Sequence, residues 1–345
     1  MDALCNISAM FIIPLIIILT AVISWFICGM VRNRLLAASI LDNPNERSMH
    51  TAPVPRGGGI ALWLTVLPVW IIYEIYSGQF AEHLFLLLAV AGLIIVSWLD
   101  DKKSLPARER FMVHLLAVGL GLASLPVTDL VFQGALPLWL DRVVAGFAWL
   151  WFVNLTNFMD GIDGITGAQT MHVSIGFIVA GLLAGSIPEI GFIIASALTG
   201  AAIGFLIWNW HPAKLFMGDV GSIPLGFLLG YLMMLLASQG YLGIALALPL
   251  YYAFDASLTL IRRILKKQKF WQAHREHYYQ QAALGAGSPV PVVRAIIATN
   301  AGLLALSITA LTINSWVLLL APLLVLGLLW YLKRLSILNS GNLSE

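Results

Sequence analysis

Charged residues are scarce in this sequence. Asp, Glu, Lys and Arg together make up 10% of the 345 residues, and 60% of the residues are hydrophobic. A soluble domain carries about 25% charged residues. Together with a mean hydropathy of +0.89, this scarcity excludes an ordinary soluble enzyme and indicates an integral membrane protein.

Cysteine is nearly absent as well. The two cysteines are Cys5, ahead of the first apolar run, and Cys28, inside it. This placement argues against a disulfide between them and against a nucleophilic thiol. Two cysteines so placed also provide no cysteine-based metal site.

Long apolar runs fill most of the chain and predict a single all-α membrane domain over residues 1–345. A bilayer-spanning helix needs about 20 apolar residues. Eleven runs approach that length, at roughly 9–31, 57–76, 83–99, 111–126, 142–158, 165–185, 189–208, 222–238, 241–261, 292–313 and 316–332. The first is expected to stay as a membrane span, because its flank lacks the basic residues of a cleaved signal peptide.

The basic residues predict the orientation. With eleven spans, 18 of the 19 Lys and Arg residues fall on one side of the membrane. The exception is Arg142, which falls on the other side. Cytoplasmic loops are enriched in Lys and Arg. We therefore expect an external, periplasmic N-terminus and a cytoplasmic C-terminus.

Five aspartates border apolar runs, all on the predicted cytoplasmic side: Asp100, Asp101, Asp160, Asp163 and Asp219. Charged groups at membrane depth are costly and usually functional. The first two end a span in the string SWLDDKKSLPARER. They are either a span boundary neutralised by Lys102 and Lys103, or a cation site or general base that faces a phosphate.

A second polar string, VNLTNFMDGIDGITG, follows the fifth run. It spaces Asn154, Asn157, Asp160 and Asp163 three residues apart, and in a helical turn of 3₁₀ geometry such residues share one side. Carboxylate and amide oxygens suit a hard cation such as Mg²⁺. The alternative is a polar turn between two spans, which needs fewer polar residues than this.

The string KLFMGDVGSIPLG precedes the eighth run. Asp219 or Ser222 is able to cap that helix, and a helix N-terminus also suits a phosphate. Lys214 can meet a phosphate as a point charge. Upstream, the loop DNPNERSMHTAPVPRGGG brings Arg56 and three glycines to the start of the second span.

The last long loop, 262–291, begins RRILKKQKFWQAHREHYYQQ. It is either an interfacial amphipathic helix or part of a substrate site in which His274 and His277 act as acid–base groups, phosphate partners or metal ligands. Zinc is disfavoured because further protein ligands are not evident. Phe270, Trp271, Tyr278 and Tyr279 can form an interfacial belt or stack on a base. Asp255, inside the preceding span, suits a buried charge partner or helix end better than catalysis.

Taken in order, PNERSMHTAPVPRGGG, the Asp100–Asp101 pair, NLTNFMDGIDG, FMGDVGS and the HREHYYQ loop resemble the bacterial polyprenyl-phosphate N-acetylhexosamine-1-phosphate transferases. This family includes enzymes that initiate O-antigen, enterobacterial common antigen and teichoic acid. It also includes phospho-N-acetylmuramoyl-pentapeptide transferase of peptidoglycan synthesis. The resemblance implies a multi-pass enzyme of the bacterial inner membrane. Such an enzyme moves a sugar-1-phosphate from a UDP-sugar to undecaprenyl phosphate and releases UMP at the cytoplasmic face, with Mg²⁺ or Mn²⁺.

The resemblance also implies roles for residues. Asp219, Asn157 and Asp160 would hold the metal, and Asp100, Asp101, Asp160 and Asp163 would be catalytic, the first two toward the lipid phosphate. The substrate-binding set would be Asn154, Asn157, Lys214, His274, Arg275, His277 and Arg56. A homodimer is compatible with the family, and no nucleic-acid partner is expected.

The histidine loop departs from the peptidoglycan branch, whose members carry adjacent histidines. Here the order is His274, Arg275, Glu276, His277. This favours an enzyme that initiates a surface polysaccharide such as O-antigen, with N-acetylglucosamine or a 6-deoxy-N-acetylhexosamine as the sugar. The alternatives are the peptidoglycan transferase and, in a different class, a cation-coupled transporter, which would carry its charges near the membrane midplane.

Overall fold

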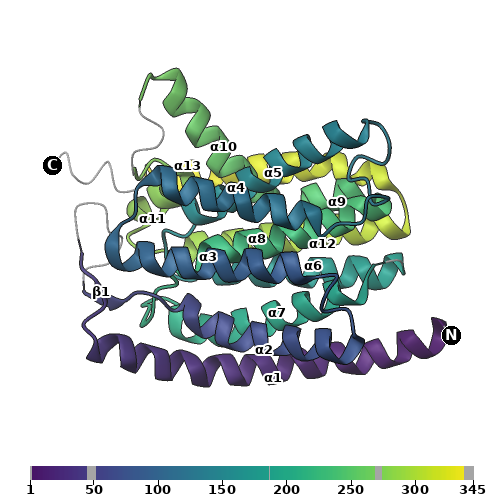
Figure 1. Ribbon diagram of the computed structural model, residues 1–345. Helices are drawn as coiled ribbons and strands as arrows, with labels where there is room; N and C mark the ends of the chain where they lie inside the picture. The colour runs from purple at the N-terminus through teal and green to yellow at the C-terminus, as the bar shows by residue number, and fades with distance from the viewer. Residues whose placement is uncertain (1, 45–51, 186, 269–273, 338–345) are drawn as a thin grey trace.

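The computed structural model describes residues 2–44, 52–185, 187–268 and 274–337, with side chains from residue 11 onward. Within these ranges the fold is a bundle of long helices (Figure 1). The first half contains α1 (Asp2–Ala37), α2 (Gly59–Ser77), α3 (Leu84–Lys103), α4 (Ala107–Ala123), α5 (Leu138–Phe158) and α6 (Ile165–Ala184). The second half contains α7 (Glu189–Asn209), α8 (Asp219–Leu236), the π-helical turn η1 (Ala237–Tyr241), α9 (Leu242–Ala247), α10 (Leu250–Leu265), α11 (Tyr278–Ala286), α12 (Val290–Thr312), the 3₁₀ turn η2 (Ser315–Leu320) and α13 (Ala321–Leu335).

Nine helices among the described residues are long and apolar enough to cross a membrane. This confirms a mainly helical membrane protein. Two expected spans are shorter in the structure: α4 has 17 residues, and the run 241–261 is divided between α9 and the 16-residue α10. The division falls at Pro249, which lacks the N–H that an uninterrupted helix would use. Eleven spans and the orientation therefore remain predictions.

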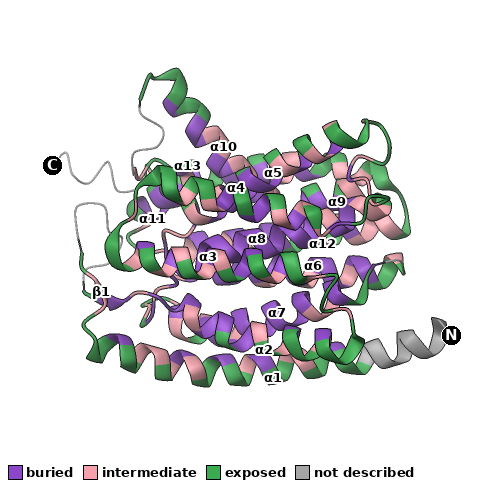
Figure 2. Ribbon diagram, in the orientation of Figure 1, coloured by how far each residue is buried: buried purple, intermediate pink, exposed green. Residues whose placement is uncertain are grey.

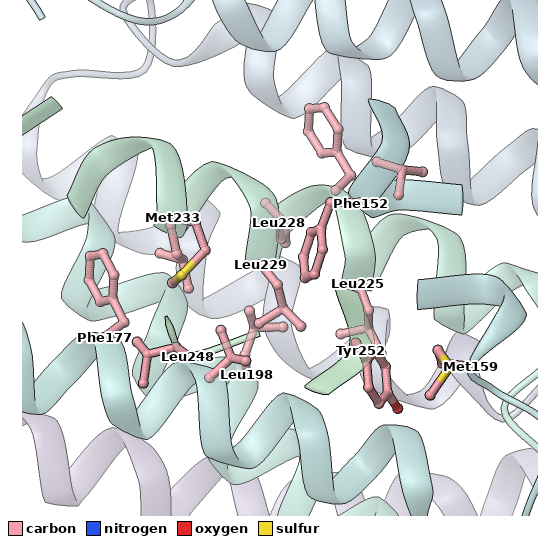
Figure 3. Close-up of a cluster of buried hydrophobic side chains, with 14 of the residues drawn as sticks. Phe152, Met159, Phe177, Leu198, Leu225, Leu228, Leu229, Met233, Leu248 and Tyr252 are labelled. Carbon is pink, nitrogen blue, oxygen red and sulfur yellow. The ribbon is translucent and has the colours of Figure 1, made fainter. Parts of the chain in front are cut away.

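Helix α8 is the centre of the bundle. Of 18 consecutive residues in its span, which continues through α9, 94% are buried, whereas the share in α1 is 22%. Figure 2 shows the same contrast, with α8 mostly buried and α1 largely exposed or intermediate. Around it pack α3, α5 and α6. Figure 3 shows the apolar cluster on its flanks, where Phe152, Phe177, Leu198, Leu248 and Tyr252 surround Leu225, Leu228, Leu229 and Met233. A helix enclosed on all sides can be apolar all round, which accounts for the sequence of α8.

Glycines allow the closest helix contacts. A Cβ at Gly200 or Gly204 of α7 would overlap the backbone of α1, and one at Gly226 would lie 2.9 Å from Cβ of Thr156 on α5. Small residues serve this purpose in membrane bundles. Gly185, which forms a four-residue pair with Gly181, has a different role: it ends α6 in a left-handed conformation and has open space around it.

The structure contains two short strands, which the sequence pattern did not predict. β1 (Leu41–Asp42) pairs antiparallel with β2 (Val54–Pro55), and the chain then continues alongside Phe216. This pairing brings the proline- and glycine-rich loop against the segment that leads into α8. Arg47, Lys269, Phe270 and Trp271, and the side chain of Cys5, lie outside what the structure describes.

Candidate active site

Asp219 is the first residue of α8 and lies at the end of the bundle where α3 ends and α2 begins. Its Oδ1 accepts a hydrogen bond from Nδ2 of Asn157 on α5, at 3.1 Å, and lies 2.9 Å from Nη2 of Arg56. Its Oδ2 lies 3.6 Å from Nη1 of Arg110 on α4. Residues from three separate segments therefore converge on the Asp219 carboxylate.

The backbone fixes Arg56 at this place. The N–H groups of Gly57 and Gly58 both donate to the carbonyl of Phe216, at 3.2 and 2.8 Å, and Phe216 N–H donates to the carbonyl of Pro55. A Cβ at Gly59 would overlap the backbone of Gly221. The glycine run is therefore required for the start of α2 to pack directly on the start of α8.

The paired aspartates have different partners. Asp101 accepts hydrogen bonds from the N–H groups of Asp219 and Val220, at 3.0 and 2.9 Å, and its side chain is 1% exposed. It thus caps α8 from a neighbouring helix, and neither Asp219 nor Ser222 does so. Asp100 accepts from Leu105 N–H at 2.6 Å and from Arg110 at 2.8 Å.

The row of Asn154, Asn157, Asp160 and Asp163 does not form one ligand surface. Asn154 donates to the carbonyl of Leu150, one turn back, and Asp163 accepts from Nδ1 of His211 at 2.7 Å and from Ala213 N–H. Helix α5 ends at Phe158, so the residues after it leave the helical face. Asn157 alone of the row makes a direct contact with Asp219 among the hydrogen bonds that the structure describes.

Asp160 lies in the turn after α5, partly buried. Burial raises the pKa of the Asp160 carboxyl to about 7; the negative charges of Asp219 and Asp101 add to this effect, while a hydrogen bond from Thr166 and the positive charge of Arg56 oppose it. Burial lowers the pKa of Arg56, but the carboxylates of Asp219, Asp101, Asp42 and Asp160 outweigh it and leave that pKa above its ordinary value. The two residues belong to the same electrostatic cluster as Asp219.

Ser222, considered as a cap in the sequence, completes this cluster. Its hydroxyl accepts a hydrogen bond from Asn157 Nδ2 at 2.9 Å and donates to the carbonyl of Gly218. The amide of Asn157 is thereby held between α5 and the first turn of α8. Arg110 was not predicted as a site residue from the sequence, because it belongs to a string of charged residues, KKSLPARER, that is typical of an exposed loop. In the structure it is the fourth residue of α4.

The histidine loop joins this cluster through α11. Tyr279, fully buried, donates from its hydroxyl to the carbonyl of Phe158 at 2.9 Å. A Cβ at Gly161 would overlap that hydroxyl. The start of α11 therefore packs on the turn that carries Asn157 and Asp160.

His274 and His277 differ in environment. His277 is 2% exposed, with its Nδ1 3.2 Å from Oδ1 of Asp255. Asp255, buried inside α10, also accepts from the N–H groups of Tyr278 and Tyr279, at 3.0 and 3.1 Å, at the start of α11. It is therefore a buried partner of α11, and it does not lie at the end of its own helix. His274 stacks on His277 and is half-buried; burial lowers its pKa to about 4, aided by the charges of His277 and Arg263.

Arg275 and Lys214 lie at the edge of the cluster. Arg275 accepts a hydrogen bond at its carbonyl from the side chain of Gln281. Lys214 is exposed, and its backbone N–H donates to the carbonyl of Trp208. These contacts involve the backbone of Arg275 and Lys214, so the role of both side chains in substrate binding stays a prediction.

No group of three or more His, Cys, Asp and Glu side chains arranged as a metal site occurs among the described residues. Mg²⁺ does not require one, since it is usually bound through one or two carboxylates together with substrate phosphates and waters. Four carboxylates, of Asp100, Asp101, Asp160 and Asp219, share this cluster with two guanidinium groups. The donor set and its excess negative charge fit a divalent cation.

Sequence comparisons identify the protein family. The profile of glycosyl transferase family 4 matches residues 83–237, which include both paired aspartates, Asn157, Asp160 and Asp219. A probable undecaprenyl-phosphate N-acetylglucosaminyl 1-phosphate transferase of Bacillus subtilis (strain 168) is 28% identical over 292 residues, 81% of this chain and 78% of the relative.

Two further relatives support the same assignment. Phospho-N-acetylmuramoyl-pentapeptide-transferase of Chlamydia pneumoniae is 31% identical over 265 residues, 68% of this chain and 74% of the relative. Decaprenyl-phosphate N-acetylglucosaminephosphotransferase of Mycolicibacterium smegmatis is 30% identical over 234 residues, 61% of this chain and 56% of the relative. The chain belongs to glycosyl transferase family 4 and is a membrane-embedded polyprenyl-phosphate sugar-1-phosphate transferase.

Proposed function

We propose that this enzyme transfers an N-acetylhexosamine-1-phosphate from a UDP-sugar to undecaprenyl phosphate, releases UMP, and thereby initiates a surface polysaccharide such as O-antigen. The observation that carries the proposal is the convergence of Arg56, Asn157 and Arg110 on Asp219 at the N-terminus of the central helix. One substrate is a phosphate anchored in lipid and the other a water-soluble pyrophosphate. A charged cluster at one end of the membrane bundle suits both.

The cofactor in this proposal is Mg²⁺, with Mn²⁺ as a substitute. Asp219 and Asp160 would hold it, and Asn157 would contribute its Oδ1 after turning its amide, since its Nδ2 faces Asp219 in this structure. A bound cation would supply charge neutralisation of the pyrophosphate and of the departing UMP. The protein's own contribution is then to position both phosphates and to supply fixed charge.

Arg110 is the proposed contact for the lipid phosphate. Its guanidinium group is held by Asp100 at 2.8 Å, and its side chain is 35% exposed. A guanidinium group matches a phosphate in charge and geometry, whereas the buried Asp101 serves the α8 backbone. Asp100 would therefore act by positioning Arg110, and its direct proton transfer with the lipid phosphate is the alternative within this proposal.

The proposed reaction takes place at the cytoplasmic face. Because the basic loops of the predicted orientation border the same helix ends as the aspartates, the cluster would meet a cytosolic UDP-sugar. His274 lies beside α11, which packs on the Asp160 turn, and would contact the donor. Its neutral imidazole can donate or accept a hydrogen bond at neutral pH without carrying charge.

The proposed sugar is N-acetylglucosamine or a 6-deoxy-N-acetylhexosamine. Two relatives are named for N-acetylglucosamine phosphate transfer, and the spaced histidines of HREHYYQ favour this branch. The second candidate is the transfer of phospho-N-acetylmuramoyl-pentapeptide, which the Chlamydia pneumoniae relative supports. The transporter alternative is set aside because the family is enzymatic.

A donor panel tests the proposal. Purified protein in detergent or nanodiscs is supplied with undecaprenyl phosphate, Mg²⁺ and one UDP-sugar at a time, and UMP release is measured. We expect release with a UDP-N-acetylhexosamine and none without Mg²⁺. Release with UDP-N-acetylmuramoyl-pentapeptide alone would establish the second candidate, and no release with any donor would overturn both.

Two variants test the metal assignment in the same assay. Asp219→Asn and Asp160→Asn keep the side-chain volume but remove a charge, so we expect each to lower turnover by about 10²-fold or more, the usual scale for a lost electrostatic contact to the reacting groups. Melting curves should show both folded. Near-normal turnover in both variants would refute the assignment of these carboxylates to the cation.

A further inference from the structure

Arg56 uses a single nitrogen to bridge two carboxylates. Its Nη2 lies 2.9 Å from Oδ1 of Asp101 and 2.9 Å from Oδ1 of Asp219. Asp219 is also the carboxylate proposed to bind the cation. The guanidinium group thus lies against the carboxylate that would hold the metal ion.

The other arginine of the cluster, Arg110, lies closer to Asp100 than to Asp219. Arg110 lies 2.8 Å from Asp100 but 3.6 Å from Asp219. Its shorter ion pair is therefore with Asp100, which is not one of the residues proposed to hold the cation. Arg56 contacts Asp219 at the shorter distance, so a cation on Asp219 would affect Arg56 more than Arg110.

The backbone of Arg56 is fixed while its side chain reaches solvent. Pro55 and Gly57 are hydrogen-bonded to Phe216 on either side of it. The Arg56 side chain is 38% exposed, compared with 1% for Asp101 and 16% for Asp219. The guanidinium group can therefore leave Asp219 by side-chain rotation on the exposed side, with the backbone unchanged.

Charge makes the two cations competitors. Two like charges a few ångströms apart repel each other even at the effective dielectric constant of a protein surface. A divalent cation on Asp219 would meet that repulsion from Arg56, and conversely the guanidinium group neutralises Asp219 when no metal is bound. Occupancy of Asp219 by one disfavours the other.

We infer that Arg56 is the resident counterion of Asp219 in the metal-free enzyme and that Mg²⁺ binding displaces it toward the donor pyrophosphate. The inference rests on the proposed function, which supplies the metal and the donor. A displaced guanidinium group remains within reach of the site and can pair with a phosphate through its planar fork. Metal binding would in this way release the arginine that the second substrate needs.

The test measures Mg²⁺ affinity by isothermal titration calorimetry on the purified protein without substrates. The variants are Arg56→Gln, Arg56→Lys and Arg110→Gln. Arg108→Gln is the matched control, because Arg108 is exposed near the start of α4 and its loss changes the net charge equally. Melting curves with and without Mg²⁺ accompany each titration.

Arg56→Gln should bind Mg²⁺ about tenfold more tightly than the wild type, because a competing charge is gone. Its melting temperature should fall without Mg²⁺, since Asp101 and Asp219 then repel each other, and recover with it. Arg56→Lys should restore an affinity near that of the wild type. Arg110→Gln should tighten binding less than Arg56→Gln, and Arg108→Gln should leave the affinity unchanged.

Unchanged or weaker Mg²⁺ binding by a folded Arg56→Gln variant would overturn the inference, as would equal tightening in Arg108→Gln, which would indicate a net-charge effect. If Arg56→Gln does not fold, Arg56→Met, which also removes the charge, takes its place. The same tightening of Mg²⁺ binding is then expected, and unchanged or weaker binding would overturn the inference. Failure of the proposed function is a separate result: the wild type would release no UMP in the donor panel.

Discussion

Asp101, near the end of α3, accepts a hydrogen bond from the backbone N–H of Asp219, the first residue of α8, at 3.0 Å. The N–H of Val220 donates to the same carboxylate at 2.9 Å. Gly218 has to precede Asp219, because a Cβ there would lie 2.7 Å from Asp101 Oδ2 and its φ is +74°. The second member of the aspartate pair thus positions the carboxylate at the centre of the site.

Substitution of Asp101 should affect stability as well as activity. Loss of a helix cap costs about 0.5–2 kcal/mol, and Asp101→Ala also removes a partner of Arg56. We expect a lower melting temperature together with lost UMP release. Asp219→Asn, in contrast, should lose activity with little change in melting temperature. A stable Asp101→Ala variant with an unstable Asp219→Asn variant would reverse the two assignments.

Gly161→Ala should separate α11 from the Asp160 turn. The new methyl group would overlap the hydroxyl of Tyr279 and compete with its hydrogen bond to Phe158. We expect UMP release to fall about tenfold or more, since small displacements of positioning residues are costly. Gly92→Ala on α3 is the control, because nothing lies within 4 Å of a Cβ there. Equal activity in both variants would show that the α11 contact is dispensable.

The two histidines should separate into a structural and a substrate-binding role. His277→Ala removes a buried partner of Asp255, so we expect destabilisation of about 1–3 kcal/mol, the cost of a buried polar group without its partner. His274→Ala should keep the melting temperature and raise the KM for the UDP-sugar. Melting curves and donor-titration kinetics distinguish the two. A KM effect confined to His277→Ala would contradict this division.

Mg²⁺ binding should depend on pH through Asp160. Its carboxyl, with a pKa of about 7, has to lose its proton to hold a cation, so Mg²⁺ affinity should rise by about tenfold between pH 6 and pH 8. Without Mg²⁺, the stability of the folded state depends on pH in the opposite direction and falls as the pH rises. The folded state binds the proton more tightly than the unfolded chain does, so this contribution is present at low pH and disappears as the pH rises through about 7.

Calorimetry at several pH values in buffers of different ionisation enthalpy measures this proton release directly. Asp160→Asn should abolish the release and flatten the pH dependence. A release that persists in Asp160→Asn would assign the proton to another group.

The sequence predicted the helices well wherever an apolar run stood alone between polar loops. It did not predict the division of the run 241–261 into α9 and α10 at Pro249. It also treated Asn154 and Asp163 as parts of one row, although the end of α5 at Phe158 directs Asp163 to His211. Spacing along the chain could not predict these partners, because they come from other helices.

Composition and order by themselves determined that this is a helical membrane protein, that its chemistry belongs to acidic motifs at helix ends, and that it resembles the phosphosugar transferases. Those properties follow from local hydrophobicity and residue type. Only the tertiary structure decided that Asp101 caps α8, that Arg56 and Arg110 flank Asp219, and that α11 packs on the Asp160 turn. These relationships join residues as far as 163 positions apart, and the packing of α3, α5 and α8 brings them within hydrogen-bonding distance.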